Sequence, residues 1–176
     1  ILRKLTAIFL NYQNPSLEQK ILGINFKNPV GVAAGVDKDA RLTDILPSVG
    51  FGFMEIGTIT GEPCQGNPKP RLWRIPEKKA IQVYFGLKNL GAEIISKKLK
   101  NKTFAIPLIT SIGKTNNQNT VETEAGITDY IKAYKAFTQI GQFFDINISC
   151  PNAFGGLPFS DPVKLDKLLT QIDLIK

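Results

Sequence analysis

The 176-residue chain contains no histidine, only two cysteines, and one each of methionine and tryptophan. Without an imidazole base, a serine triad is excluded, and proton transfer must use a thiol, carboxyl, amine, phenol or hydroxyl group. The cysteines, Cys64 and Cys150, form no disulfide framework and have no metal-ligand spacing. We therefore expect a reducing compartment and no metal site.

Long apolar runs are also missing. No segment is long enough to span a bilayer, and Arg3 and Lys4 precede only the short apolar stretch Leu5–Leu10, so we expect no secretory signal. The length and ordinary composition suit one globular domain with a real core. The first residue is Ile1 rather than Met, which leads us to expect further residues upstream.

Positive charge is concentrated in one part of the chain. The net charge is +7, and residues 69–102 carry ten Lys or Arg against Glu77 and Glu93, which is ten minus two, or +8. Such a patch could meet phosphate, anionic lipid or nucleic acid. The alternative is a solvated helix face, which we favour for the four lysines of residues 97–102. No nucleic-acid motif accompanies the patch, so we expect no nucleic-acid binding.

Short apolar segments alternate with longer amphipathic ones. The expected strands are Pro29–Ala34, Phe53–Gly57, Ala105–Ile112 and Phe143–Ser149. The expected helices are Arg41–Val49, Leu90–Lys100, Ile127–Ile140 and Pro162–Ile175, the last with Asp161 as its N-cap. Strand followed by helix, four times over, predicts a parallel sheet with helical crossovers.

The segment Thr60–Asn89 is too long for an ordinary loop between a strand and a helix. It contains two β-like pieces, Arg71–Ile75 and Ile81–Phe85, and enough aromatic residues to be ordered. A further short helix, Leu2–Leu10, precedes the first strand.

Polar residues follow each of the four predicted strands, where barrels and open α/β sheets bind their ligands. This repetition favours the N-terminal half of a (β/α)₈ barrel over a doubly wound sheet, and no Gly-x-Gly-x-x-Gly turn supports a dinucleotide-binding fold. A full barrel needs about 250 residues, so we expect roughly half of it to be absent.

The stretch Asn147–Asn152 has the most chemical content. Period-two alternation puts Asn147 and Ser149 on one face of the predicted strand, and Pro151 ends it, so Cys150 is expected at the rim. A thiol there can act as a general base or nucleophile if positive charge is near, and Lys38 or backbone dipoles are candidates for that charge. The alternative is that Cys150 acts only as a small buried hydrophobic residue.

The stretch Ala33–Lys38 offers small residues that would let a flat cofactor approach the backbone, and Lys38 could hold a carboxylate. A surface Asp–Lys pair is equally compatible with this segment. Thr58 could bond a ring carbonyl or merely cap its loop, and Cys64 has only loop neighbours, so we interpret it as incidental.

These segments together resemble dihydroorotate dehydrogenase, and specifically its membrane-associated, quinone-reducing class. The motifs that carry the resemblance are Asn25–Asp39, Glu55–Thr58 and Gly66–Arg74, and the likeness runs from about residue 20 onward. It implies that residues 1–20 are part of a helical extension and residues 21–176 the first half of an FMN-binding (β/α)₈ barrel.

The family oxidises (S)-dihydroorotate to orotate in pyrimidine synthesis, with FMN as the hydride acceptor. The resemblance implies that Cys150 is the catalytic base and that substrate binds Lys38, Asn147 and Asn152. The FMN-binding positions that it implies are Ala34, Gly35, Val36, Asp37, Lys38, Thr58, Ser111 and Asn147.

Three positions depart from the quinone-class pattern. That class normally has serine where Cys150 stands, and cysteine, like the stretch Gly155–Pro162, is typical of the soluble class. Val83 occupies a position where a substrate-binding asparagine is expected, with Gln82 beside it. Ser111 replaces an FMN-contacting asparagine with a shorter hydrogen-bonding group.

The electron acceptor therefore has two candidates. The quinone class implies a membrane quinone and a peripheral location on the inner face of the cell membrane. Residues 2–10 favour this class, because Leu2, Leu5, Ile8 and Phe9 would form an apolar face for lipid; packing under the barrel is the alternative. The soluble class would pass electrons to fumarate or NAD. The family's flavin lysine and phosphate site belong to later strands, so we expect this chain alone to be inactive.

Overall fold

The computed structural model describes residues 2–175, except for the Leu2 side chain. At its centre is a four-stranded sheet in which every neighbouring pair is parallel. Its strands, in spatial and chain order, are β3 (Gly31–Asp37), β4 (Phe53–Ile59), β7 (Leu108–Ile112) and β8 (Phe143–Ile146). The predicted parallel half-barrel is confirmed.

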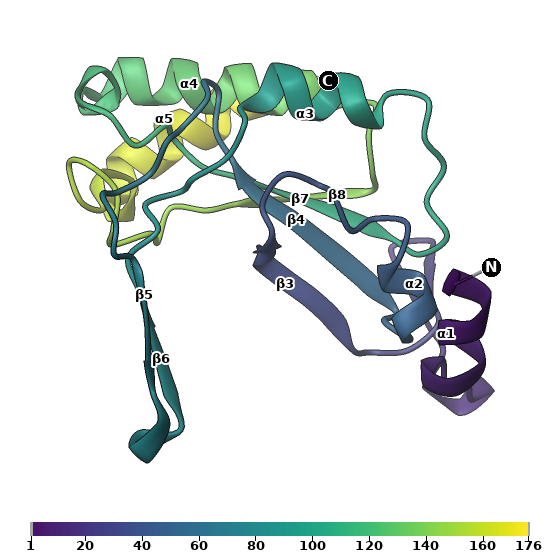
Figure 1. Cartoon of the computed structure of the whole chain (residues 1–176). Helices are drawn as coiled ribbons and strands as arrows, with labels where there is room; N and C mark the ends of the chain where they lie inside the picture. The colour runs from purple at the N-terminus through teal and green to yellow at the C-terminus, as the bar shows by residue number, and fades with distance from the viewer. Residues whose placement is uncertain (1, 176) are drawn as a thin grey trace.

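Helices cover one face of this sheet (Figure 1). They are α3 (Ala92–Leu99), α4 (Thr123–Phe137) and α5 (Pro162–Asp173). The core between the layers contains Met54 and Ile56 from β4, Ile95 from α3 and Phe137 from α4, all fully buried. Burying each such side chain contributes about 1.5–3 kcal/mol. The alternation along β4 therefore fixes which side chains point away from the helices.

An aromatic cluster lies at the amino end of the uncovered face. Phe26 contacts the Phe53 ring edge-on, with ring centres 5.7 Å apart, and stacks on Phe143 at 6.1 Å. Phe26 belongs to a hairpin of β1 (Gln19–Ile21) and β2 (Ile24–Phe26). The sequence pattern did not predict this hairpin, because three-residue strands are too short to show a period.

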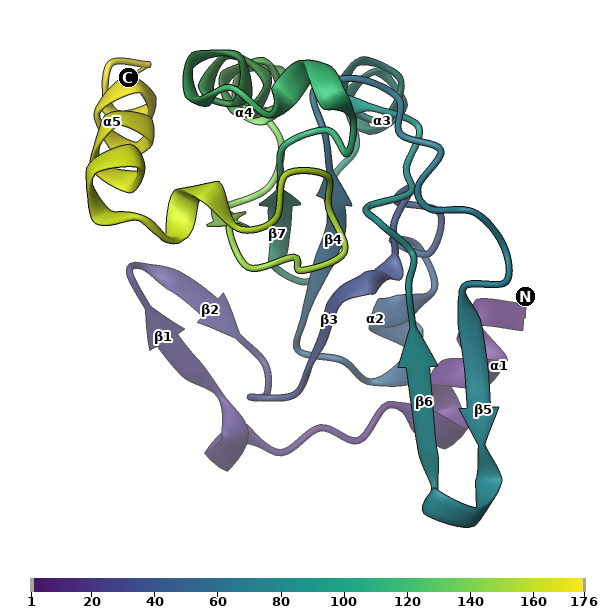
Figure 2. The same cartoon turned by 90° about the vertical axis from the view of Figure 1, so that its left-hand side faces the viewer.

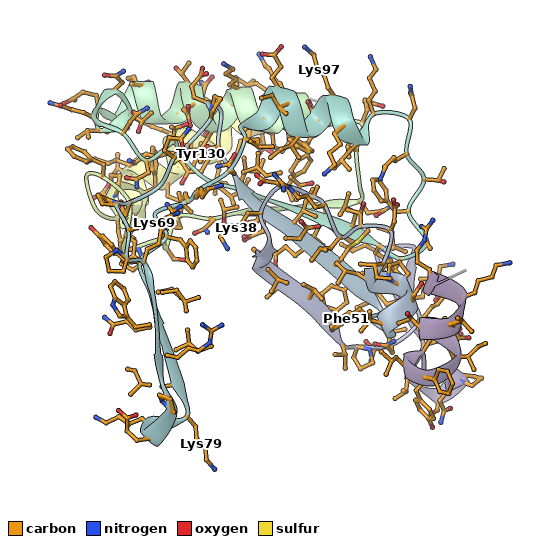
Figure 3. All side chains as sticks on the ribbon, viewed as in Figure 1. Lys38, Phe51, Lys69, Lys79, Lys97 and Tyr130 are labelled. Carbon is orange, nitrogen blue, oxygen red and sulfur yellow. The ribbon has the colours of Figure 1, made fainter. Side chains whose placement is uncertain are left out.

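The predicted β-like pieces form an antiparallel hairpin of β5 (Leu72–Ile75) and β6 (Ala80–Val83), joined by the 3₁₀ turn Pro76–Lys78. Figures 1 and 2 show that it leaves the carboxyl end of the sheet and extends away from the domain. In Figure 3 Lys79 lies at its far tip, whereas Lys97 points outward from the helical layer. The basic residues 69–102 therefore do not form one continuous surface.

Several predicted boundaries were wrong. β3 continues to Asp37 instead of ending at Ala34, β7 begins at Leu108 instead of Ala105, and α4 runs Thr123–Phe137 instead of Ile127–Ile140. The expected helix Arg41–Val49 is reduced to the single turn α2 (Leu46–Val49), because the Asp37 carboxylate accepts hydrogen bonds from the backbone of Arg41 and Leu42, both at 2.7 Å. β8 ends at Ile146 rather than Ser149. The remaining 3₁₀ turns are Pro15–Leu17, Gln118–Thr120 and Pro158–Ser160.

The N-terminal helix α1 (Leu2–Leu10) forms as predicted and packs beside α2. Ile8 and Phe9 are 74% and 82% exposed, so packing under the barrel does not cover them. The expected contribution of Leu2 lies outside the described side chains. Among residues 2–175, no helix has both the length and the apolar character needed to cross a bilayer.

The Asp161 side chain accepts a hydrogen bond from Lys164 N at 3.0 Å and caps α5, as predicted. Replacing it with alanine leaves an unpaired N–H at the helix start, so Asp161→Ala should lower the free energy of unfolding by about 1 kcal/mol in urea titrations. Asp166→Ala, which removes an exposed carboxylate within the same helix, is the matched control. Equal stability of the two variants would contradict the capping role.

Candidate functional site

A cavity of about 230 Å³ lies at the carboxyl end of the sheet, between the strand ends and the β5–β6 hairpin. Its lining comes from four separate segments, because parallel strands bring their carboxyl ends to one edge. The lining residues are Ala34, Gly35, Lys38, Thr58, Val83, Phe85, Gly86, Leu87, Lys88, Asn147, Cys150 and Asn152.

Lys38 lies at the end of β3, on the side of the sheet that faces the hairpin (Figure 3). Its ammonium donates a hydrogen bond to the Gly35 carbonyl and sits 4.5 Å from the centre of the Phe85 ring. Burial lowers the pKa of Lys38 from its ordinary value. Gly35 has a φ of +97°, and a side chain there would project into the cavity.

A chain of hydrogen bonds connects the cavity to the inner face of the sheet. The Asn147 amide donates to the Thr58 hydroxyl at 2.7 Å, and the hydroxyls of Thr58 and Ser111 lie 3.0 Å apart. Ser111 donates to the Asp145 carboxylate at 2.8 Å. Because the single Ser111 proton goes to Asp145, Thr58 must donate to Ser111, and Asn147 must turn its NH₂ group toward Thr58.

Asp145 lies beside a second carboxyl group, that of Glu55 on β4. Glu55 accepts a hydrogen bond from the Ala34 backbone at 3.1 Å. Burial, together with the neighbouring Asp145 charge, raises the pKa of Glu55 above its ordinary 4.5. The face of the sheet that the helices leave uncovered thus carries two carboxyl groups, Glu55 and Asp145, and the hydroxyl of Ser111. These groups lie between the aromatic cluster and the cavity.

The chain turns sharply after β8. Asn147 Oδ1 accepts hydrogen bonds from Ser149 N at 3.1 Å and Ser149 Oγ at 3.3 Å, and this turn ends the strand. The periodicity had predicted that Asn147 and Ser149 share one face of a strand. This prediction was wrong, because both residues lie in the turn after β8. Cys150 is nevertheless half-buried at the cavity rim, in the expected place.

A network of asparagines joins the loops around the cavity. Asn67 donates to the Asn152 carbonyl at 2.9 Å, and Asn116 donates to Asn67 Oδ1 at 3.0 Å. Asn152 Nδ2 lies 3.5 Å from the Val83 carbonyl, a long contact. The hairpin base, the loop after β7 and the loop after β8 are thereby held together.

Three predicted FMN positions do not present their side chains to the cavity. Val36 is 63% exposed, and Asp37 is buried in the turn that it caps. Ser111 is fully buried behind Thr58 and bonds Thr58 and Asp145 instead of lining the cavity. Val83, at the expected asparagine position, does line the cavity and gives it an apolar wall.

Lys114 was missed as a site residue. It follows β7 and is only 4% exposed, and it lines a smaller cavity together with Cys150, Tyr130 and Asn147. The phenol of Tyr130 donates to the Asn147 carbonyl at 2.8 Å, and burial raises its pKa. The signal that could have found Lys114 is its place directly after a strand, where the other site residues lie.

The lining suits a flat, polar heterocycle that carries an anionic group. Ala34 and Gly35 leave one side open, Thr58 and Asn147 supply polar groups, and Lys38 supplies a cation. The volume is below the roughly 300 Å³ at which pockets for drug-sized ligands begin. It would therefore take a ring system and not a whole flavin nucleotide.

A family model and curated proteins that match this chain all belong to one family. The family model for dihydroorotate dehydrogenase matches residues 16–173. A dihydroorotate dehydrogenase (quinone) from a Nitratiruptor species is 43% identical over 156 residues, covering 88% of this chain and 43% of that protein. The protein of the same name from a Synechococcus species is 37% identical over 156 residues, covering 88% and 40%.

Solved structures agree. The ligand-free dihydroorotate dehydrogenase of Eimeria tenella superposes with a TM-score of 0.83 at 30% identity, over 98% of this chain and 50% of that one. The same enzyme in complex with ferulenol gives 0.81 at 28% identity, over 99% and 49%. The chain thus spans half or less of the length of these proteins.

The raised pKa of Glu55 leads to a pH-dependent prediction. The folded state binds this proton more tightly than the unfolded state, so the proton's contribution to stability is present at low pH and is lost as pH rises above 4.5. Glu55→Gln should therefore raise the melting temperature at pH 7, and the gain should disappear near pH 4. Exposed Glu18 provides the control Glu18→Gln. A gain for Glu55→Gln that does not change with pH would contradict the assignment.

Proposed function

This chain belongs to the dihydroorotate dehydrogenase family, and we propose that its protein oxidises (S)-dihydroorotate to orotate with bound FMN in pyrimidine synthesis. The observation that carries this proposal is the convergence of Lys38, Asn147 and Cys150 on one cavity. A cation, an amide and a thiol are the groups that a cyclic carboxylic acid with a removable carbon-bound proton requires.

We assign substrate binding to Lys38, Asn147 and Asn152. The Lys38 ammonium pairs with the substrate carboxylate, for which it has two N–H groups besides the one that it donates to the Gly35 carbonyl. Asn147 offers an amide whose orientation is fixed by Thr58. The apolar wall at Val83 removes one amide contact that the family pattern would supply.

We assign the role of base to Cys150. The thiolate takes the proton from C5, while the hydrogen on C6 leaves with its electron pair and a C5=C6 double bond forms. Bound FMN would supply the acceptor for that electron pair. Proton and electron pair thus leave neighbouring carbons, and the thiol is restored to thiolate when its proton passes to solvent.

The FMN ring would be held by Ala34, Gly35, Thr58 and Asn147, which all line the cavity. The backbone of Val36, Asp37 and Lys38 continues this wall. The buried Ser111 acts one step removed, by holding the Thr58 hydroxyl.

For the final acceptor we propose a membrane quinone, which the names of the relatives support. The alternative acceptor is fumarate or NAD, as in the soluble class, because cysteine at the position of Cys150 is typical of that class. An apolar cavity of about 310 Å³ lies under α1, lined by Leu10, Val30 and Phe51 among others, but it shares no lining residue with the site. Turnover with ubiquinone, fumarate and NAD as alternative acceptors discriminates among the three.

The base is tested by anaerobic stopped-flow reduction of FMN by dihydroorotate, in FMN-loaded protein that contains residues 1–176. General bases contribute about 10²- to 10⁴-fold, so Cys150→Ala should slow reduction by that order while FMN stays bound. Cys150→Ser should keep part of the rate, and that rate should rise at higher pH than in the parent. The reason is that a hydroxyl ionises at much higher pH than an ordinary thiol, whose pKa is about 8.5.

The control is Cys64→Ser, because Cys64 is buried and does not itself line the site cavity, although it donates to the carbonyl of Gly86, which does. If Cys150→Ala reduces FMN as fast as the parent, another residue is the base. If the parent binds dihydroorotate without reducing FMN, the proposed activity itself fails.

We further propose that α1 rests on the cytoplasmic membrane surface. Ile8 and Phe9 are exposed, and Arg3 and Lys4 can reach lipid phosphates. Because each buried apolar side chain is worth about 1.5–3 kcal/mol, Ile8→Asn with Phe9→Asn should weaken binding to phosphatidylglycerol vesicles by at least about tenfold in co-sedimentation. Leu174→Asn, at a 73%-exposed leucine after α5, is the control. Equal binding of all three proteins would exclude α1 as the contact.

A further inference from the structure

Lys114 is a buried cation without an ion-pair partner. Its ammonium donates to the Phe154 carbonyl at 2.6 Å, and no carboxylate of residues 2–175 forms an ion pair with it. Asp129 is near, but its carboxylate already accepts hydrogen bonds from Thr115 and from Gly61 N. Burying an ammonium in this way is unfavourable, and such groups gather at functional sites.

The group that shares its surroundings is Cys150. Both residues line the same cavity of about 20 Å³, which is close to the room that a single water molecule needs. Burial lowers the pKa of Lys114, whereas negative charge on Asp129 and on Cys150 raises it. The Lys114 ammonium and the Cys150 thiol thus face one small cavity, in which a thiolate would attract the ammonium.

Lys38 is less suited to this role, although it lines the larger cavity with Cys150. Its ammonium is bonded to Gly35 and stacked on Phe85, on the hairpin side. The charges that act on Lys38 are those of Asp39, Lys88 and Arg71. Lys38 is thus placed for the substrate carboxylate, and Lys114 is the lysine that shares the small cavity with the thiol.

We propose that Lys114 is the positioning residue for the catalytic thiol, and that its buried ammonium stabilises the Cys150 thiolate from the small cavity behind the substrate site. The Phe154 carbonyl holds this ammonium in place and ties it to the loop that follows Cys150. The proposal rests on the proposed function only for the role of Cys150 as base. The effect of Lys114 on the charge state of the thiol does not depend on that function.

The other titratable groups around the pair are identified. Tyr130 and Asp129 face Lys114 from α4, and burial raises the pKa of both. On the other side, Lys38 and Lys88 face Cys150 across the substrate cavity. Tyr130 stays neutral through the range in which a thiol ionises, so Lys114 is the group whose removal should change thiolate formation most.

The test is the rate of Cys150 alkylation by iodoacetamide, followed across pH 6–10 by peptide mass spectrometry on the chain without cofactor or substrate. Only the thiolate reacts, and its fraction falls tenfold for each unit by which its pH midpoint rises. Lys114→Met should therefore slow alkylation at pH 7 by about tenfold and move the half-maximal rate to higher pH. Lys114→Arg, which keeps the charge, should restore most of the rate.

The matched control is Lys98→Met, because Lys98 also bonds backbone carbonyls, those of Asp39 and Ala40, but lines neither of the two cavities that Cys150 lines. It should alkylate like the parent. An unchanged profile in Lys114→Met, or a tenfold loss in Lys38→Met instead, would overturn the proposal. Because FMN and dihydroorotate are not used, failure here is separate from failure of the proposed activity.

A reciprocal measurement avoids the risk that Lys114 variants misfold. Coupling between two sites is mutual, so removing the thiolate must make the Lys114 ammonium easier to deprotonate. In Cys150→Ala, the ¹³Cε resonance of Lys114 should titrate at lower pH than in the parent, and that of Lys98 should not move. Identical Lys114 titrations in the two proteins would refute the coupling.

Discussion

Four parallel strands bury one face against α3 and α4, and the remaining features of the site follow from this packing. Because Met54 and Ile56 must point into the helical layer, Glu55 must point the other way, toward Asp145 on β8. The same register brings the ends of β3, β4 and β8 together. The cavity is thus positioned by apolar side chains that never touch it.

The strands, the parallel order and the Asp161 cap could be predicted because each depends on local pattern. The helix at Arg41–Val49 could not, since the competing Asp37 hydrogen bonds are local but leave no trace in hydrophobic periodicity. Asn147 ends β8 in the same way, by bonding its own backbone. Residue type and place in the chain located Cys150 and Lys38, but the burial of Ser111 and Lys114 depends on long-range packing.

The departures from the quinone-class pattern are structurally connected. Where the family pattern has an asparagine at position 111, this chain has a serine that reaches a carboxylate on the next strand, Asp145. Ser111 therefore supports Thr58 from behind and does not line the cavity. Val83 is apolar, so the polar side chains that line the cavity are those of Lys38, Thr58, Lys88, Asn147, Cys150 and Asn152.

The hydrogen bonds that run from the Thr58 hydroxyl through the Ser111 hydroxyl to the Asp145 carboxylate all have the same donor-to-acceptor direction. Each member has one proton to give, so an acceptor at the Asp145 end obliges every group above it to point the same way, up to the amide of Asn147. An amide at position 145 could reverse that order only if the Asn147 amide also flipped and gave up the hydrogen bonds that its Oδ1 accepts from Ser149. Two relatives with superimposable cavities could then differ in whether the rim presents a hydrogen or a lone pair, a difference that shape comparison cannot detect.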